Sequence, residues 1–345
     1  MAYKGLAKKL LDKFGVEEGD WIAFDTREGH FEGALMPRPE SSSENCLVVK
    51  LASGYNVGIE ITGSEEIIKK KASKQLSAFK KKMFCFKEGK PLLSLIHTGG
   101  TIGSKVDYKT GGVSALMSPK DVLATAPKIK EITNLKNVVS PFTIDSADMT
   151  SQEWQKIASL VAKELNSGAQ GVVVTHGTDT LHYTAAALAF MLQNLDSPVV
   201  LVGAQRSPDR GSFDGAMNLY CAACVAASDY AGVAIVMHES SNDDFCAILP
   251  ATKSRKMHSS RRDAFKAINV LPLGRVSSNG EITWLREDVK KSLKNTRENA
   301  GKNNAGAGEV KADTRFEKKI GLLKAHPNAD PALLDFLVDK GVRGV

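Results

Sequence analysis

The chain has 345 residues, of which 42% are hydrophobic and 25% are charged, and its net charge is +7. This length favours two or three domains, and the composition is that of a globular protein rather than a disordered or fibrous one. No apolar stretch is long enough to span a bilayer. Because residues 1–15 lack the apolar core and cleavage site of a secretory signal, we expect a cytoplasmic protein without membrane contact.

The five cysteines are an odd number spread over the whole chain, which does not indicate a disulfide framework. Cys221 and Cys224 have the spacing of a redox or metal-binding pair, but they lie in an alanine-rich stretch without a second pair nearby. The sequence therefore predicts reduced thiols, with these two cysteines as small core residues of a buried helix.

An N-terminal module is predicted over residues 1–65. An amphipathic helix covers about residues 4–13, and residues 19–61 consist of short runs of β-branched and aromatic residues separated by Gly, Pro, Ser and Asn. This pattern is typical of a small all-β barrel. We see no catalytic constellation in it and interpret it as a docking or spacer module.

Basic residues are concentrated in two segments, 66–90 and 286–319. Residues 69–90 alone contain nine lysines and one acidic residue. Aromatic residues do not alternate with these lysines, as they do on surfaces that stack nucleic-acid bases. We interpret both segments as solvated linkers, while binding to tRNA remains an open alternative.

Strands alternate with helices from residue 91 onwards. Thr150 and Glu153 form a capping box before one predicted helix, and Gly168 can end it. The alternation predicts an α/β fold, with a parallel, right-handed sheet and flanking helices over residues 91–285. Such sheets bind ligands at the carboxyl ends of their strands. The apolar runs expected to form strands are residues 92–97, 137–142, 171–176, 198–203 and 232–237.

The first of these strands ends in the sequence HTGGTIG, which presents Thr101 among glycines. The glycines allow a tight turn and a close approach of the backbone to a ligand. A phosphate cradle is disfavoured, because the loop has neither the Walker arrangement nor the G-x-G-x-x-G spacing. A hydroxyl nucleophile beside backbone N–H groups and a plain glycine turn both remain possible interpretations.

A second strand end, in the sequence THGTDT, offers Thr178 and Asp179. Taken alone, either residue would be interpreted as the N-cap of the following helix. The two loops nevertheless lie at equivalent strand ends, and both offer a threonine between glycine and small polar residues. Because an alcohol does not ionise by itself near neutral pH, a lysine made neutral by desolvation could be the base, with candidates in residues 251–265.

The two threonine loops and the lysine segment together resemble the bacterial-type L-asparaginase family, over about residues 92–285. The resemblance implies that Thr101 is the attacking hydroxyl and that Thr178, Asp179 and a lysine form the second catalytic group. In the family this lysine precedes a phenylalanine by nine positions, which fits Lys256 before Phe265 and leaves Lys253 out of register.

The same resemblance implies further site residues. Ser146 matches the position that binds the α-carboxylate and amino end of the substrate, and Tyr108 matches a mobile tyrosine that closes on the nucleophile. Amide hydrolysis would proceed through an acyl-threonine, with no metal. His176 and His182 flank the helix start, where a structural or rim role is favoured over zinc binding.

The β module followed by this domain, with residues 203–219 and the Arg-rich segment 255–265, resembles the family of archaeal glutamyl-tRNA(Gln) amidotransferase D subunits, over most of residues 10–285. The resemblance implies that glutamine, or asparagine, is the amide donor. Ammonia would pass to the amidotransferase E subunit, which holds Glu-tRNA(Gln) and uses ATP and Mg, so no cofactor is expected in the present chain. It also implies a homodimer core within a heterotetramer.

Two alternatives remain open at this point: a stand-alone L-asparaginase, and a catalytically inactive scaffold or sensor that keeps the fold. Residues 320–345 resemble the start of the smaller carboxy-terminal α/β domain of these families, and we expect that domain to be incomplete here.

Overall fold

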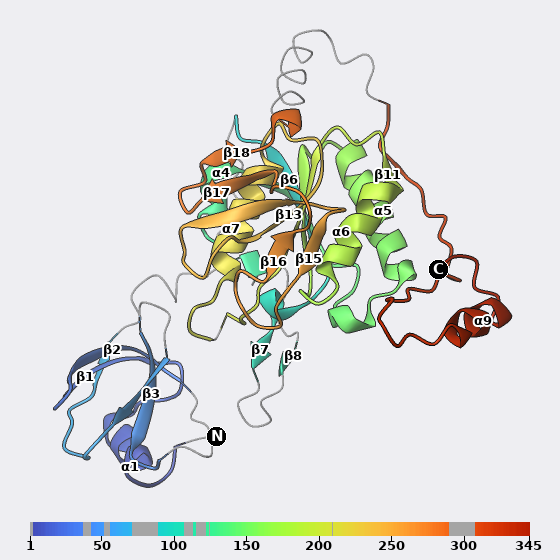
Figure 1. Ribbon diagram of the computed structural model, residues 1–345. Helices are drawn as coiled ribbons and strands as arrows, with labels where there is room; N and C mark the ends of the chain where they lie inside the picture. The colour runs from blue at the N-terminus through green and yellow to red at the C-terminus, as the bar shows by residue number, and fades with distance from the viewer. Residues whose placement is uncertain are drawn as a thin grey trace.

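The computed structural model describes residues 3–36, 43–51, 56–70, 89–106, 113–114, 122–123, 125–208, 210–289 and 308–345. Two sheets organise these residues, a small one near the N-terminus and a large one in the middle of the chain (Figure 1). No helix in the described ranges is long and apolar enough to cross a bilayer.

The N-terminal sheet is antiparallel and has the strand order β4-β3-β2-β1-β5. Ile22, Phe24 and Leu35 are fully buried and pack against Leu10 and Leu11 of helix α1. The predicted helix and all-β module are therefore confirmed. The elements are α1 (Gly5–Phe14), β1 (Trp21–Thr26), β2 (Gly29–Leu35), β3 (Cys46–Leu51), β4 (Asn56–Glu60) and β5 (Ile68–Lys70).

The large sheet has the strand order β18-β17-β14-β13-β12-β10-β6-β9. The segment from β9 to β13 is parallel, as predicted, whereas β14, β17 and β18 continue it in antiparallel fashion. The strands are β6 (Leu92–His97), β9 (Asn134–Val139), β10 (Gly171–Thr175), β12 (Pro198–Val202), β13 (Gly232–His238), β14 (Phe245–Pro250), β17 (Gly274–Ser277) and β18 (Ile282–Trp284).

The predicted strands are confirmed with one shift. The strand expected at residues 137–142 begins at Asn134 and ends at Val139, before Pro141, whose nitrogen cannot donate to a ladder. All five residues of β10 are buried, which explains why its sequence is apolar without alternation.

Helices cover both faces of the large sheet and make a three-layer structure (Figure 1). Helices α4 (Ile129–Ile132) and α7 (Gly215–Ala226) lie on one face, and α5 (Ser151–Asn166) and α6 (Leu181–Met191) lie on the other. Cys221 and Cys224 are buried in α7, so their prediction as core residues is confirmed. All four cysteines of the described ranges are free thiols, and Cys85 lies outside these ranges.

The C-terminal segment runs along the outer side of α5. Strand β19 (Lys311–Ala312) pairs with β11 (Leu192–Gln193), and Asn166 of α5 donates to the Val310 carbonyl at 2.9 Å. Farther on, Ile320 and Gly344 form an isolated parallel bridge, and helix α9 (Ala332–Asp339) lies between them in the sequence.

The predicted capping box is present at the N-terminus of α5, so substitutions there test how much it stabilises the protein. Thr150→Ala removes the side-chain acceptor of the Gln152 N–H, and we expect a loss of about 1 kcal/mol in the free energy of unfolding. Urea denaturation measures this. Glu153→Gln keeps an acceptor for the Thr150 N–H and should lose less; equal losses in both variants would contradict the capping interpretation.

Candidate active site

The predicted site lies where the strand order changes direction. After β6 the chain continues to β9 on one side, whereas after β10 it continues to β12 on the other side. Neighbouring strands whose connections diverge leave a crevice at their carboxyl ends, which is where ligands bind in open α/β sheets. Thr101 begins the 3-10 turn η1 (Thr101–Gly103) after β6, and Thr178 follows β10.

The two threonine loops touch through their glycines. Gly100 has φ +83°, and a Cβ built on it would lie 2.4 Å from both the Cα and the N of Gly177. A side chain at residue 100 would therefore force the two loops apart. Thr101 and Thr178 each come directly after one of these two glycines, so the contact brings both threonines to the same crevice.

A third loop joins the same contact. Gly99, with φ +106°, leaves no room for a Cβ beside the Ile144 carbonyl, and a Cβ on Gly177 would meet the Ser146 side chain at 2.6 Å. Ser146 begins the short turn η2 (Ser146–Asp148) and is 2% exposed. Gly99, Gly100 and Gly177 are therefore needed for the close packing of three loops.

Lys256 lies directly against the second threonine loop. Its Nζ donates to Thr178 Oγ1 at 2.7 Å and to Asp179 Oδ1 at 2.8 Å. The Lys256 side chain is 10% exposed, whereas that of Asp179 is 67% exposed, so the lysine is the sheltered partner of this ion pair.

The nine-residue spacing between Lys256 and Phe265 has a structural basis. Strands β15 (Ser254–Lys256) and β16 (Phe265–Ala267) form an antiparallel hairpin in which these two residues are direct partners. Phe265 is buried and anchors the hairpin, while Lys253 is exposed in the turn that follows β14. Lys256, not Lys253, is therefore the lysine that reaches the crevice.

Neither Thr178 nor Asp179 is the N-cap of α6, so the alternative interpretation of these two residues as helix caps is wrong. The N-cap is Thr180, so both residues precede the helix, and their side chains contact Lys256 instead. The Thr180 hydroxyl donates to the Ser146 carbonyl at 2.7 Å and ties the two loops together.

The structure thus brings together five of the six predicted site residues: Thr178, Asp179 and Lys256 by direct contact, and Thr101 and Ser146 through the packed loops. Within the described part of the chain, the Thr101 hydroxyl makes no hydrogen bond and is available to a substrate. Tyr108 lies outside the described residues.

Gln205 is a neighbour of the site that the sequence analysis did not assign. Its Oε1 accepts a hydrogen bond from Thr178 Oγ1 at 3.1 Å. The backbone N–H groups of Gln205 and Arg206 donate to the buried Asp214 carboxylate, and burial raises the pKa of that carboxyl. The sequence does contain a signal for Gln205 as a site residue, because it follows β12. The carboxyl end of β12 lies at the same edge of the sheet as that of β10.

Two buried histidines lie under the loops. His97 Nδ1 is 2.7 Å from Thr175 Oγ1, and these two residues pair across the ends of β6 and β10. Burial lowers the pKa of His97 to about 4, and it does the same for His176. Both rings are therefore neutral at pH 7.

At least two hollows in the structure are large enough to hold a small ligand. One, of about 340 Å³, is lined by Asp179 and Lys256 together with His182, Arg255 and His258. Burial lowers the pKa of His182, as do the charges of Arg255 and Lys256. Within the described ranges, no three His, Cys, Asp or Glu side chains are grouped as metal ligands would be.

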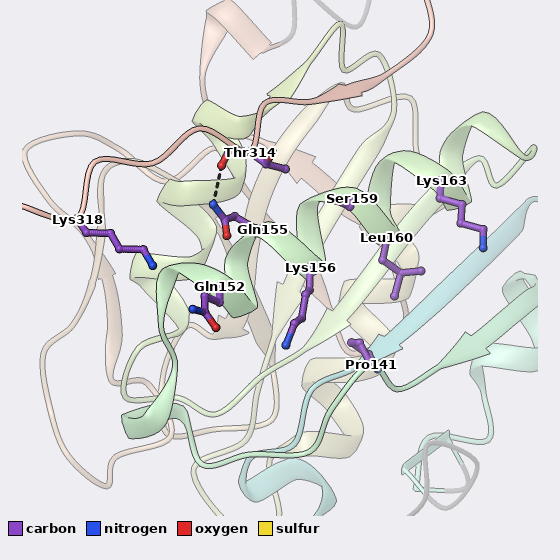
Figure 2. Close-up of a pocket in the computed structure, with 9 residues that line it drawn as sticks. All are labelled: Pro141, Gln152, Gln155, Lys156, Ser159, Leu160, Lys163, Thr314 and Lys318. Atoms are coloured by element: carbon purple, nitrogen blue, oxygen red, sulfur yellow. Dashed lines mark hydrogen bonds between the residues drawn. The ribbon is translucent and has the colours of Figure 1, made fainter.

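The other hollow is a groove of about 810 Å³ along the outer side of α5 (Figure 2). Figure 2 shows Lys156, Lys163 and Lys318 around it, and Gln155 donating to the Thr314 carbonyl of the C-terminal segment. None of the five predicted site residues within the described ranges lines this groove, although it is the larger of the two hollows.

Two protein-family descriptions match parts of this chain. The family described as "Asparaginase, N-terminal" matches residues 92–290, and "GatD N-terminal domain" matches residues 16–69. The D subunit of the glutamyl-tRNA(Gln) amidotransferase from Thermococcus kodakarensis is 44% identical over 98% of this chain and 74% of its own length. The chain belongs to the family of these D subunits.

Other relatives and solved structures agree. The corresponding D subunit from Methanosphaera stadtmanae is 38% identical over 100% of this chain and 76% of its own length. The structure of an L-asparaginase from Thermococcus kodakarensis matches with a TM-score of 0.58 and 26% identity, over 72% of this chain and 68% of that one. The asparaginase-like α/β fold and the amidotransferase family are therefore both established for this chain.

The loop contact predicts a difference between two glycines of similar positive φ. Gly100→Ala should lower amide hydrolysis about 100-fold, because the added methyl displaces the Thr101 loop from the Thr178 loop. Gly168, with φ +98°, has no atom within 4 Å of a built Cβ. Gly168→Ala should therefore lose only about 1–2 kcal/mol of stability and no activity. Ammonia release and urea denaturation measure the two effects; equal activity in both variants would contradict the contact.

The buried histidines predict the pH dependence of stability. In the unfolded chain a histidine titrates near pH 6.5, whereas His97 and His176 stay neutral down to about pH 4 in the folded state. The unfolded state therefore binds more protons between these values, so stability falls as the pH is lowered. At pH 5 we expect a loss of roughly 2 kcal/mol for each histidine relative to pH 7.

Urea denaturation at pH 7 and pH 5 measures this loss. His97→Gln should reduce the difference between the two pH values by roughly 2 kcal/mol, the contribution expected for one buried histidine. The matched control is His258→Gln, at an exposed position, which should keep the full difference. An unchanged difference in His97→Gln would count against the buried, neutral ring.

Proposed function

We propose that this chain is the ammonia-releasing component of a tRNA-dependent amidotransferase. It hydrolyses the side-chain amide of glutamine, and the ammonia converts Glu-tRNA(Gln) to Gln-tRNA(Gln) on a partner, the amidotransferase E subunit. The observation that carries the proposal is the cluster of Thr178, Asp179 and Lys256 beside the loop of Thr101. The D-subunit relatives and the match of residues 16–69 support the amidotransferase assignment.

In the proposed reaction, Thr101 Oγ1 attacks the carboxamide carbon, and the C–N bond breaks as ammonia leaves with the proton taken from the hydroxyl. Water then hydrolyses the acyl-threonine and restores the enzyme. We assign proton transfer to Thr178 and Lys256, which are in hydrogen-bond contact, and we assign to Asp179 the role of holding the lysine. Ser146 would bind the α-carboxylate and amino end of the donor, and Tyr108 would close over it.

No cofactor is needed for these steps. ATP and Mg would act on the E subunit, which would also make most of the contacts with Glu-tRNA(Gln). A homodimer of this chain would form the core of the complex. The protein would act in the cytoplasm.

A second candidate is a stand-alone L-asparaginase, because solved L-asparaginases share the fold of the large sheet. The N-terminal module weighs against it, because that module matches the D-subunit family rather than the asparaginase domain.

Ammonia release tests the proposal. The substrates are glutamine and asparagine, each with and without the E subunit and Glu-tRNA(Gln). We expect release from glutamine chiefly with the loaded partner, and none from Thr101→Ala. Release from asparagine that is independent of partner and tRNA would favour the second candidate, and an inert wild type in every combination would overturn both.

The role of the lysine has its own matched control. Lys256→Met should lower ammonia release at least about 100-fold, as expected for the loss of a general acid or base. Lys253→Met should leave it unchanged, since Lys253 is exposed and outside the contact. Similar activities in the two variants would refute the assignment of Lys256.

A further inference from the structure

A chain of three side chains leads from the outer helix α5 to the catalytic loop. Trp154 of α5 donates its Nε1–H to the Thr184 hydroxyl of α6 at 2.8 Å. That hydroxyl is 2.8 Å from His176 Nε2, and His176 Nδ1 is 2.7 Å from the Gly177 carbonyl. Thr184 and His176 are fully buried.

The direction of every hydrogen bond in this chain is determined. A carbonyl only accepts, so His176 Nδ1 carries the proton and donates to Gly177. Because burial lowers the pKa of His176 and keeps the ring neutral at pH 7, its Nε2 has no proton and accepts. The Trp154 indole only donates, so the Thr184 oxygen accepts from it and the Thr184 O–H donates to Nε2.

This series of hydrogen bonds ends at the Gly177 carbonyl, which belongs to the peptide group between Gly177 and Thr178. The Gly177 carbonyl and the Thr178 N–H belong to one planar unit, so a hydrogen bond to the carbonyl also fixes the direction of the N–H. Gly177 is the residue that touches Gly100 and Ser146. Rotation of this peptide would move Thr178 relative to Lys256 and would disturb all three loops.

We propose that Thr184 and Trp154 are positioning residues for amide hydrolysis, acting through His176 to hold the Gly177–Thr178 peptide in its catalytic orientation. Neither residue lines the hollow beside Asp179 and Lys256. The inference rests on the proposed function for its kinetic test, but the tautomer of His176 tests it separately.

Thr184 can be changed in two ways that separate its hydroxyl from its methyl group. Thr184→Val keeps the branched shape and removes the donor to His176, whereas Thr184→Ser keeps the hydroxyl and loses the methyl. For Thr184→Val we expect kcat for glutamine to fall about tenfold or more with KM changed less than about threefold. Thr184→Ser should restore kcat to within about threefold of wild type.

Trp154→Phe removes only the outermost donor. The Trp154 ring packs on Phe316, with centroids 5.4 Å apart, and phenylalanine can keep this contact. Since the Thr184–His176 bond remains, kcat should fall less than in Thr184→Val, again with little change in KM.

The alternative is a role in stability alone. In that case both Thr184 variants would have a lower Tm, and kcat per folded enzyme would be unchanged. A Thr184→Val enzyme with the kcat of wild type, or a Thr184→Ser enzyme as slow as Thr184→Val, would overturn the proposal.

The tautomer of His176 is read from the ¹⁵N shifts of histidine-labelled protein. We expect a protonated Nδ1, a bare Nε2 and no titration from pH 8 to pH 6 in the wild type, with a changed Nε2 shift in Thr184→Val. An Nε2–H tautomer would overturn the proposal. If wild type released no more ammonia than Thr101→Ala, the proposed function would fail, and this spectrum alone would decide the hydrogen-bond chain.

Discussion

The active site depends on one contact, the backbone approach of Gly100 to Gly177 at the carboxyl ends of two neighbouring parallel strands. The strand order makes this the place where the connections diverge, so a crevice opens there without any insertion. A Cβ on Gly100 would overlap the backbone of Gly177, so the two loops can meet this closely only because residue 100 is a glycine. The glycines therefore determine how near Thr101 comes to Thr178, while the chemistry belongs to the residues that follow them.

Buried neutral polar groups stabilise the loops that form the contact between Gly100 and Gly177. His97 and Thr175 join the ends of β6 and β10, and the hydrogen bonds from Trp154 through His176 hold the next peptide. Uncharged rings avoid the large cost of burying an unpaired charge, yet they still supply directed hydrogen bonds. The charged pair of Lys256 and Asp179 lies instead at the rim, where the carboxylate remains in contact with water.

The lysine comes from outside the parallel part of the sheet. It lies on the hairpin β15–β16, which follows the antiparallel strand β14 and is fixed by the buried ring of Phe265. The parallel strands thus supply the two threonine loops. Lys256 is supplied by the part of the chain that follows the antiparallel strand β14. This division explains why the strands after residue 245 matter for the site: the hairpin that follows β14 carries Lys256.

The sequence by itself determined the predicted parallel strands, the cap of α5, the buried cysteines of α7 and the family, because apolar runs, turn residues and motif spacing are local signals. Only the tertiary structure decided that α6 begins after Thr180, that Gln205 contacts Thr178, and that Trp154 and Thr184 reach the catalytic loop through His176. Lys256, which donates a hydrogen bond to Thr178, lies 78 positions from it in the sequence, and Gln205, which accepts one from Thr178, lies 27 positions from it. The packing of strands and helices determines which residues far apart in the sequence come into contact, and a local sequence pattern does not contain this information.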